Sequence, residues 1–178
     1  MANPVTHVLV PMLIMETYRR YFAKKKFSRW YVFLAGFFGG APDFDLIYSW
    51  FVTGSFDMMY HRNVTHTLLI PIITLFLGLT IYMLYSRKAL RHKGWKVSYL
   101  VLFMMTIGTT FHVLIDGIDG LVYWFYPFHF KLTLPGLIVN KYRAAFIDGI
   151  LLFAWILYDE EFFNDILRVL RKIKRKIT

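Results

Sequence analysis

The sequence predicts an all-α fold: a polytopic membrane bundle of about four to five helices with a basic amphipathic helix at its C-terminal end. Hydrophobic residues make up 57% of the 178 residues and aromatic residues 20%, well above the apolar share of soluble domains. Several apolar stretches approach the length of about 20 residues that a helix needs to cross a membrane. Most of the 21 lysines and arginines lie between or after these stretches, in clusters at 19–29, 87–96 and 168–176. This alternation is typical of the positive-inside rule.

The composition also excludes several classes of protein. The net charge of +10 is concentrated beside apolar stretches, which favours membrane orientation over direct nucleic-acid binding. There is no cysteine, so disulfides and thiolate metal sites are excluded. The first apolar run is followed by its basic residues and not preceded by them, so we expect no signal peptide. One chain of this length predicts a single membrane domain over residues 1–178.

The first half of the chain predicts a short helix and then an interrupted span. Residues 4–18 are too short for a confident crossing, and Pro4 suits the first turn of a short helix. Residues 30–52 are long enough, but Gly39-Gly-Ala-Pro42 should loosen or break that helix. Irregular backbone at membrane depth is tolerated only inside protein or beside a polar cavity. We therefore expect a site to be built at this break.

The second half predicts three further apolar helices. Thr65 is a candidate N-cap for a span that runs to about Ser86 and has His66 in its first turn. A second span covers about 95–115, and residues 117–141 predict an extended, aromatic-rich loop with a possible interfacial segment. Residues 144–158 form the last apolar helix, with Asp148 in its first turn. The tail at 160–178 is basic with one apolar face, so we expect it to lie on the membrane surface.

If the basic clusters are cytoplasmic, the candidate metal ligands all fall at the outer face of the membrane, and Asp148 joins them there. These candidates are the histidines and aspartates set into apolar sequence: His7, Asp43, Asp45, His61, His66, His112 and Asp116. Ionisable residues inside a membrane are energetically expensive and usually functional. The sequence therefore predicts one metal site that these residues share.

The separation of His112 and Asp116 by four residues puts both side chains on one face of a helix. Such a pair, taken alone, also fits a structural contact. Asp43 and Asp45 are two residues apart, so both carboxylates converge only if the backbone is broken between Gly39 and Pro42. The aspartates could otherwise belong to an ordinary capped turn.

Other polar residues near the predicted site have two interpretations each. Arg62 could hold a phosphate through its guanidinium group, or it could be a surface arginine that reaches lipid headgroups. Asp119 could orient His112 or belong to the loop. His129 could be a late ligand or an interfacial histidine.

With these residues assembled, the sequence resembles the LexA-binding, inner-membrane-associated family of proteins assigned as metal-dependent hydrolases. The resemblance covers roughly residues 1–130. The matching pieces are Thr6-His7, Gly40-Ala-Pro-Asp-Phe-Asp45, His61-Arg62 with Thr65-His66-Thr67, His112-Val-Leu-Ile-Asp116, and the loop that ends in Tyr126-Pro127-Phe128. That family is more distantly similar to the zinc-dependent phospholipase C and P1 nuclease enzymes. The resemblance implies metal ligation by His7, Asp43 or Asp45, His61 or His66, His112 and Asp116.

Together these features predict a membrane hydrolase that uses one or two divalent ions, with zinc favoured over manganese or iron. The metal would activate water for attack on a phosphoester of a lipid or a lipid-linked substrate. Asp45 or Asp119 would act as a base or orient a ligand, and Arg62 would bind an anionic group. We expect the protein to cross the cell membrane several times, among membrane lipids, with its site on the extracytoplasmic side. The alternatives are a membrane scaffold without enzymatic activity and an ion-binding or transport protein.

Overall fold

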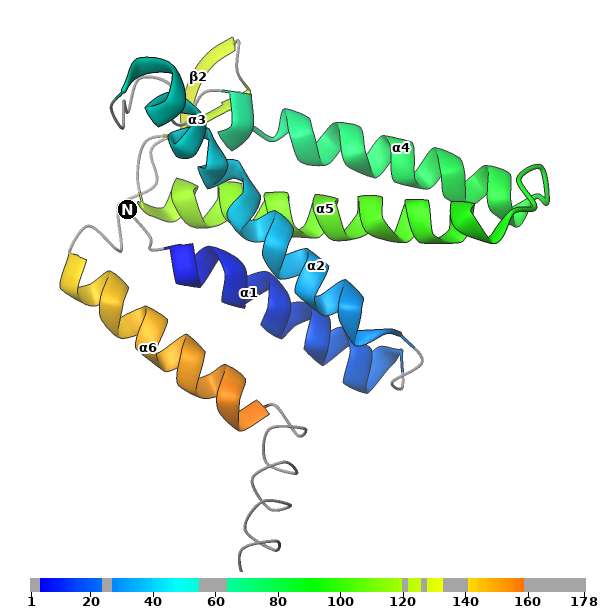
Figure 1. Ribbon diagram of the computed structural model, residues 1–178, viewed down its shortest axis with the longest axis horizontal. Helices are drawn as coiled ribbons and strands as arrows, with labels where there is room; N and C mark the ends of the chain where they lie inside the picture. Colours follow the sequence, from blue (N-terminus) through cyan, green and yellow to red (C-terminus); the bar gives the residue numbers. More distant parts are fainter. Residues whose placement is uncertain are drawn as a thin grey trace, which may run out of the picture.

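A computed structural model describes residues 4–23, 27–54, 64–119, 122–125, 128–132 and 141–158, and these residues are mostly helical (Figure 1). The chain begins with α1 (Pro4–Thr17) and a π-helical turn, η1 (Tyr18–Phe22). Next come α2 (Arg29–Gly40), the 3₁₀ turn η2 (Ala41–Asp43), α3 (Phe44–Thr53) and a second 3₁₀ turn, η3 (Val64–His66). The remaining elements are α4 (Leu69–Ser86), α5 (Lys93–Asp119), β1 (Val122–Phe125), β2 (Phe128–Leu132) and α6 (Lys141–Tyr158).

The long helix α5 is at the centre of the arrangement. It packs against α4 on one side and α2 on another, α1 lies on α2, and α6 runs beside α1 (Figure 1). The apolar core at the α1–α2–α5 junction is formed by buried side chains: Leu9, Met12, Met15, Val32, Ala35 and Met104.

Two helices, at Leu69–Ser86 and Lys93–Ile118, are long and apolar enough to cross a membrane. Along α4, large apolar side chains such as Ile72, Phe76 and Leu77 are exposed. A soluble helix would bury such a surface, so these side chains are suited to contact with lipid.

The predicted break after Gly39 is confirmed. Helix α2 ends at Gly40, and the chain passes through the 3₁₀ turn with Pro42 buried before α3 begins at Phe44. Gly39 also lets α2 approach α1, because a Cβ there would lie 2.2 Å from the backbone oxygen of His7. A Cβ at Gly108 would lie 2.6 Å from the backbone oxygen of Ala35. Close approach at small residues is a common way for membrane helices to pack.

The predicted N-cap at Thr65 is wrong. Helix α4 starts at Leu69, and Thr65 lies in η3. The Thr65 hydroxyl donates a hydrogen bond to Asp45 Oδ2 at 2.6 Å, so it is committed to a tertiary contact. At the start of α4, the backbone N–H of Leu69 instead donates a hydrogen bond to the side-chain oxygen of Thr67, Oγ1, at 3.3 Å.

Other boundaries also differ from the sequence prediction. Helix α5 continues to Asp119, and α6 begins at Lys141, which places Asp148 in its second turn. The predicted loop contains an antiparallel hairpin of β1 and β2, as its aromatic and β-branched residues favour strands. This hairpin is a small exception to the all-α prediction. The tail at 160–178 lies outside the described residues.

A buried cluster that the sequence did not predict links α1, η1 and α6. Glu16 accepts hydrogen bonds from Arg19 Nε at 2.7 Å and Arg20 Nε at 2.7 Å, and its side chain is 2% exposed. Arg20 also donates to the backbone oxygen of Tyr158, and its guanidinium lies 4.2 Å from the centre of the Tyr158 ring. The carboxylate thereby neutralises charge within the protein, and Arg20 ties the end of α6 to the end of α1.

Candidate metal centre

The structure brings most of the predicted ligands together at one end of α5. The first contributors are His7 from α1, Asp43 from η2 and His66 from η3. His112 and Asp116 come from α5, four residues apart and with Nε2 and Oδ2 separated by 3.5 Å. His7, His66 and His112 are among the largest fully buried side chains. Segments far apart in sequence therefore meet around one buried point.

His112 is held in a single orientation. Its Nδ1 lies 2.7 Å from the backbone oxygen of Gly39, so Nδ1 carries the proton and donates it to that carbonyl. The other nitrogen, Nε2, faces Asp43 Oδ1 at 3.7 Å and Asp116 Oδ2 at 3.5 Å. This buried Nε2 has no hydrogen-bond partner among the residues that the structure describes. A lone pair aimed at carboxylates is suited to a cation.

His66 is oriented by Thr65 and Asp45. Its Nδ1 lies 2.9 Å from Thr65 Oγ1 and 3.4 Å from Asp45 Oδ2, and the Thr65 hydroxyl itself donates to Asp45. These contacts hold the proton on Nδ1 and leave Nε2 facing Asp43 Oδ1 and Asp116 Oδ2, each at 3.4 Å. Asp45 therefore lies behind the histidine, as an orienting carboxylate does in many metal sites.

His66 precedes α4 and lies outside the two membrane-capable helices. Burial lowers its pKa, but hydrogen bonds to Asp43 and Asp45 and the nearby charge of Asp116 outweigh burial and raise the pKa to about 9. In the metal-free protein, His66 is therefore protonated near neutral pH. A metal ion that binds Nε2 must displace the proton that Nε2 carries in this charged form, while Nδ1 keeps its own proton.

His7 completes the cluster from the first helix. Its Nε2 lies 3.4 Å from Asp116 Oδ1, and its ring lies against the ring of His112 with centres 4.1 Å apart. The centre of the His66 ring lies 4.6 Å from that of the His112 ring. His112 is thus shared by two groups whose ligand atoms lie within 4.8 Å of one another: His7, His112 and Asp116, and Asp43, His66 and His112.

The spacing of these atoms also fits ligation of a metal ion. The contacts of 3.4 to 3.7 Å are longer than the usual N–H···O distance of about 2.7–3.2 Å. Ligand atoms held tetrahedrally at about 2.0–2.1 Å from zinc would lie about 3.3–3.4 Å from each other. Neutral histidine and carboxylate are also the ligand types of zinc, manganese and iron sites. The side chains present therefore fit a divalent ion.

Some predicted site residues are not placed. His61 and Arg62 lie outside the described residues. Asp119 is the last residue of α5, but neither its side chain nor that of His129 is among those described. Asp148 lies near the cluster without joining it, since its Oδ1 accepts a hydrogen bond from the hydroxyl of Thr6, the neighbour of His7.

Sequence reasoning missed two contributors to the site, Thr65 and the backbone oxygen of Gly39. Thr65 precedes a buried histidine and follows a polar connection, which also fits the N-cap that the sequence predicted. A backbone carbonyl leaves no signal in the sequence beyond the glycine itself. Both roles depend on contacts between segments far apart in the chain, such as Gly39 with His112.

The hairpin holds one wall of the site in place. Trp124 of β1 packs against Val113 and Leu68, and its backbone oxygen accepts a hydrogen bond from Leu68 N–H at 3.0 Å. Gly117 makes room for the indole, because a Cβ there would lie 2.5 Å from Trp124 Cζ2. The hairpin therefore fixes α5 beside the segment that carries His66.

The apolar helices and the buried histidine–aspartate cluster define a helical membrane protein with a candidate metal centre. More particularly, the chain belongs to the YdjM inner membrane protein family, whose family model matches residues 1–166. No curated protein and no solved structure matches the chain. The family places the protein in a membrane, as the sequence predicted.

Proposed function

We propose that this protein is a membrane-embedded, metal-dependent hydrolase that acts on a phosphoester of a lipid or a lipid-linked molecule. The observation that carries the proposal is the convergence of His7, Asp43, His66, His112 and Asp116 on one buried point with His112 Nε2 aimed into it. Burying histidines and carboxylates from several separate segments costs folding free energy, and this cost favours a functional role for the cluster.

The five converging residues would hold one or two divalent ions, most simply zinc. A bound ion would act as a Lewis acid and lower the pKa of a water molecule at the site. Asp45 and Thr65 would keep His66 in the ligating tautomer, and Gly39 would do the same for His112. Arg62 remains our candidate for binding the anionic group of the substrate, and Asp119 remains a candidate base.

The surroundings of the cluster support a lipid-type substrate. Helix α3, which follows Asp43 directly, exposes Phe44, Tyr48, Trp50 and Phe51. Aromatic residues at this density are typical of the membrane interface. A substrate that presents a phosphoester at the interface would meet the site from this side.

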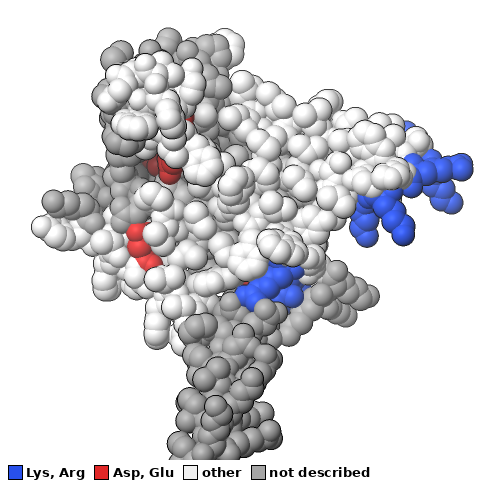
Figure 2. Space-filling model, viewed as in Figure 1, with Lys and Arg blue, Asp and Glu red and all other residues white. Residues whose placement is uncertain are grey.

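The charge distribution supports an extracytoplasmic site in a chain that crosses the membrane several times. In Figure 2, basic side chains gather at the turn between α4 and α5 and near the end of α1, where η1 carries two arginines, whereas acidic side chains lie toward the other end of the molecule. The positive-inside rule assigns the basic end to the cytoplasm. The candidate metal centre would then face the opposite side.

The first experiment measures metal in the detergent-purified protein by mass spectrometry, beside His112→Ala and the control His92→Ala. His92 is an exposed histidine before α5, so its loss tests for adventitious binding to histidine. We expect one or two equivalents of zinc, manganese or iron in the wild-type protein and the control, and loss of metal in His112→Ala. The same preparations are then assayed for hydrolysis of phospholipid and lipid-linked phosphoesters.

Each outcome decides between the candidate functions. Metal together with phosphoester hydrolysis, both lost in His112→Ala, would support the hydrolase. Metal without hydrolysis of any phosphoester would favour an ion-binding or transport role. If no preparation holds metal even after incubation with it, the cluster is a network of ion pairs, and a scaffold becomes the better account.

A further inference from the structure

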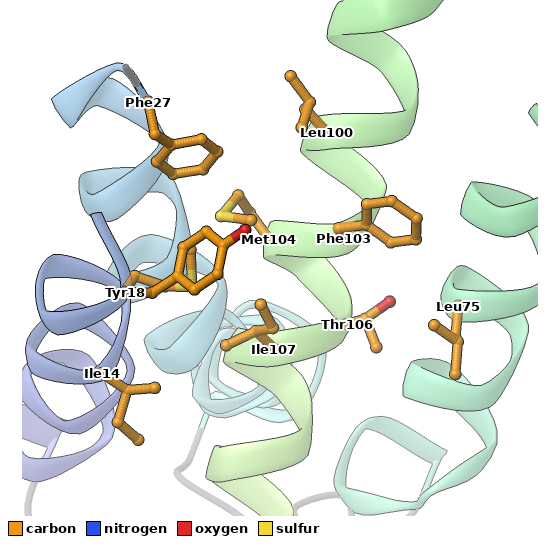
Figure 3. A pocket seen from close by; sticks show the side chains of 10 residues that line it. Ile14, Tyr18, Phe27, Leu75, Leu100, Phe103, Met104, Thr106 and Ile107 are labelled. Carbon is orange, nitrogen blue, oxygen red and sulfur yellow. The ribbon is translucent and has the colours of Figure 1, made fainter. Parts of the chain in front are cut away.

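A second feature lies on the face of α5 between α1 and α4, away from the metal centre. It is an apolar groove of about 430 Å³, within the range of about 300–1,000 Å³ that ligand pockets usually have. One wall comes from α1 and η1, with Ile14 and Tyr18, and the other comes from α4, with Leu75 (Figure 3). Its floor is α5: Leu100, Phe103, Met104, Thr106 and Ile107.

The groove offers almost no polar surface. Most of its lining is aliphatic or aromatic, and the Thr106 hydroxyl already bonds to Leu102 O and Thr74 Oγ1. Ile14, Tyr18 and Leu75 are each more than a third exposed, so the groove opens on the side of the helical bundle, where the apolar face of α4 is suited to contact with lipid. An occupant must therefore be apolar and must enter from the membrane.

The groove leads toward the basic end of the molecule. On α5, Lys96 precedes Leu100 by one turn, and Lys96, Leu100, Phe103 and Ile107 share one helical face. Lys96 is exposed, as are Arg91 and Lys93 in the preceding residues. On the other wall, Arg19 is bonded to Glu16, whereas Lys96 on the α5 side is exposed and available to an anion.

We propose that this groove binds an anionic phospholipid from the cytoplasmic leaflet. One acyl chain lies between α1 and α4 on the face of α5, and the phosphate lies beside Lys96 at the mouth. The apolar lining matches the chain, and the lysine on the same helical face matches the headgroup charge. The site does not depend on the hydrolase proposal, because none of the residues that line the groove is a candidate metal ligand. Only its assignment to the cytoplasmic leaflet rests on the orientation proposed above.

The test is native mass spectrometry of the full chain in detergent, with phosphatidylglycerol and phosphatidylcholine of the same acyl chains. We expect one phosphatidylglycerol to be retained per chain at concentrations where phosphatidylcholine is not. Leu100→Trp fills the floor of the groove and should abolish the saturable binding. The control Leu77→Trp adds the same indole to an exposed position of α4 outside the groove and should retain it.

The headgroup is tested separately with Lys96→Gln and Arg91→Gln, which each remove one positive charge from the same end of the protein. Lys96→Gln should weaken phosphatidylglycerol binding about fivefold, the change expected for one lysine at an anionic membrane surface. Arg91→Gln should weaken the binding clearly less than Lys96→Gln, because Arg91 precedes α5 and does not share the face of the groove; an equal loss in both variants would remove Lys96 from the site.

Several results would overturn the proposal. The first is that both lipids are retained equally. The second is that Leu100→Trp still binds phosphatidylglycerol saturably, and the third is that the protein forms a dimer that Leu100→Trp prevents. If Leu100→Trp fails to fold by circular dichroism, Ile14→Trp blocks the groove from the exposed wall on α1 and takes its place. Bound lipid that survives Ile14→Trp would then count against the groove.

Discussion

His66 shows how one residue depends on its neighbours for its chemical role. The Thr65 hydroxyl lies between His66 Nδ1 and Asp45 Oδ2, at 2.9 and 2.6 Å. It therefore sets which nitrogen of His66 faces the other candidate ligands. Groups of this kind behind a metal-binding histidine usually matter nearly as much as the ligand itself.

We predict that Thr65→Val weakens metal binding about 10- to 100-fold, because His66 loses the partner that fixes its tautomer and orientation. Thr65→Ser keeps the hydroxyl and should restore most of the affinity. The measurement is a metal titration by isothermal calorimetry. Thr80→Val is the control, since the Thr80 hydroxyl donates a hydrogen bond to the backbone oxygen of Phe76 within α4. Equal affinity in Thr65→Val and the wild-type protein would remove Thr65 from the site.

At the scale of elements, the position of α2 against α1 depends on Gly39. The same glycine supplies the carbonyl that orients His112, so packing and site geometry are coupled at one residue. We predict that Gly39→Ala destabilises the protein by about 1–3 kcal/mol or more, as overpacking does, and also reduces bound metal. Thermal melts and metal content provide the two measurements.

Gly40→Ala is the matched control for this prediction. Among the described residues, a Cβ at Gly40 would meet Cγ2 of Val8 at 3.1 Å, a side-chain atom that can move, whereas the Cβ at Gly39 would meet backbone. If both variants melted at the same temperature as the wild-type protein, the close approach of α2 to α1 at Gly39 would not be required for stability.

The contact between α1, η1 and α6 depends on a buried charge. Glu16→Gln leaves Arg19 and Arg20 without their carboxylate, and breaking such a buried pair typically costs about 3–5 kcal/mol. We predict a corresponding fall in melting temperature. Replacing Glu16, Arg19 and Arg20 together by leucine should recover most of the stability, because no uncompensated charge remains. A triple variant as unstable as Glu16→Gln would show that the ion pairs themselves stabilise the contact.

At the scale of the whole molecule, the basic residues and the candidate metal centre lie toward different ends of the protein. This separation predicts how the protein is oriented in the membrane. Because the chain has no cysteine, single cysteines can report on each end. Arg91→Cys, in the turn between α4 and α5, should react with a membrane-impermeant maleimide only after the cells are lysed. Thr53→Cys, at the end of α3, should react in cells whose inner membrane is intact. The reverse pattern would place the candidate metal centre on the cytoplasmic side.

Much of this architecture follows from local features of the sequence. The helix break after Gly39 was predictable because Gly-Gly-Ala-Pro disfavours a continuous helix, and the shared face of His112 and Asp116 follows from helical periodicity. The start of α4 was not predictable, because a threonine before an apolar run fits an N-cap equally well. The Glu16 cluster was missed because its partner Tyr158 is far away in the chain.

The sequence by itself determined that this is a helical membrane protein with histidines and aspartates in apolar surroundings, because composition and spacing are local properties. Only the tertiary structure decided which of these residues meet. Asp43 and Asp45 lie on different sides of His66, with Asp43 facing Nε2 and Asp45 facing Nδ1. The sequence could not separate these positions, because the direction of a side chain after a broken helix is set by the packing of distant segments and not by its neighbours in the chain.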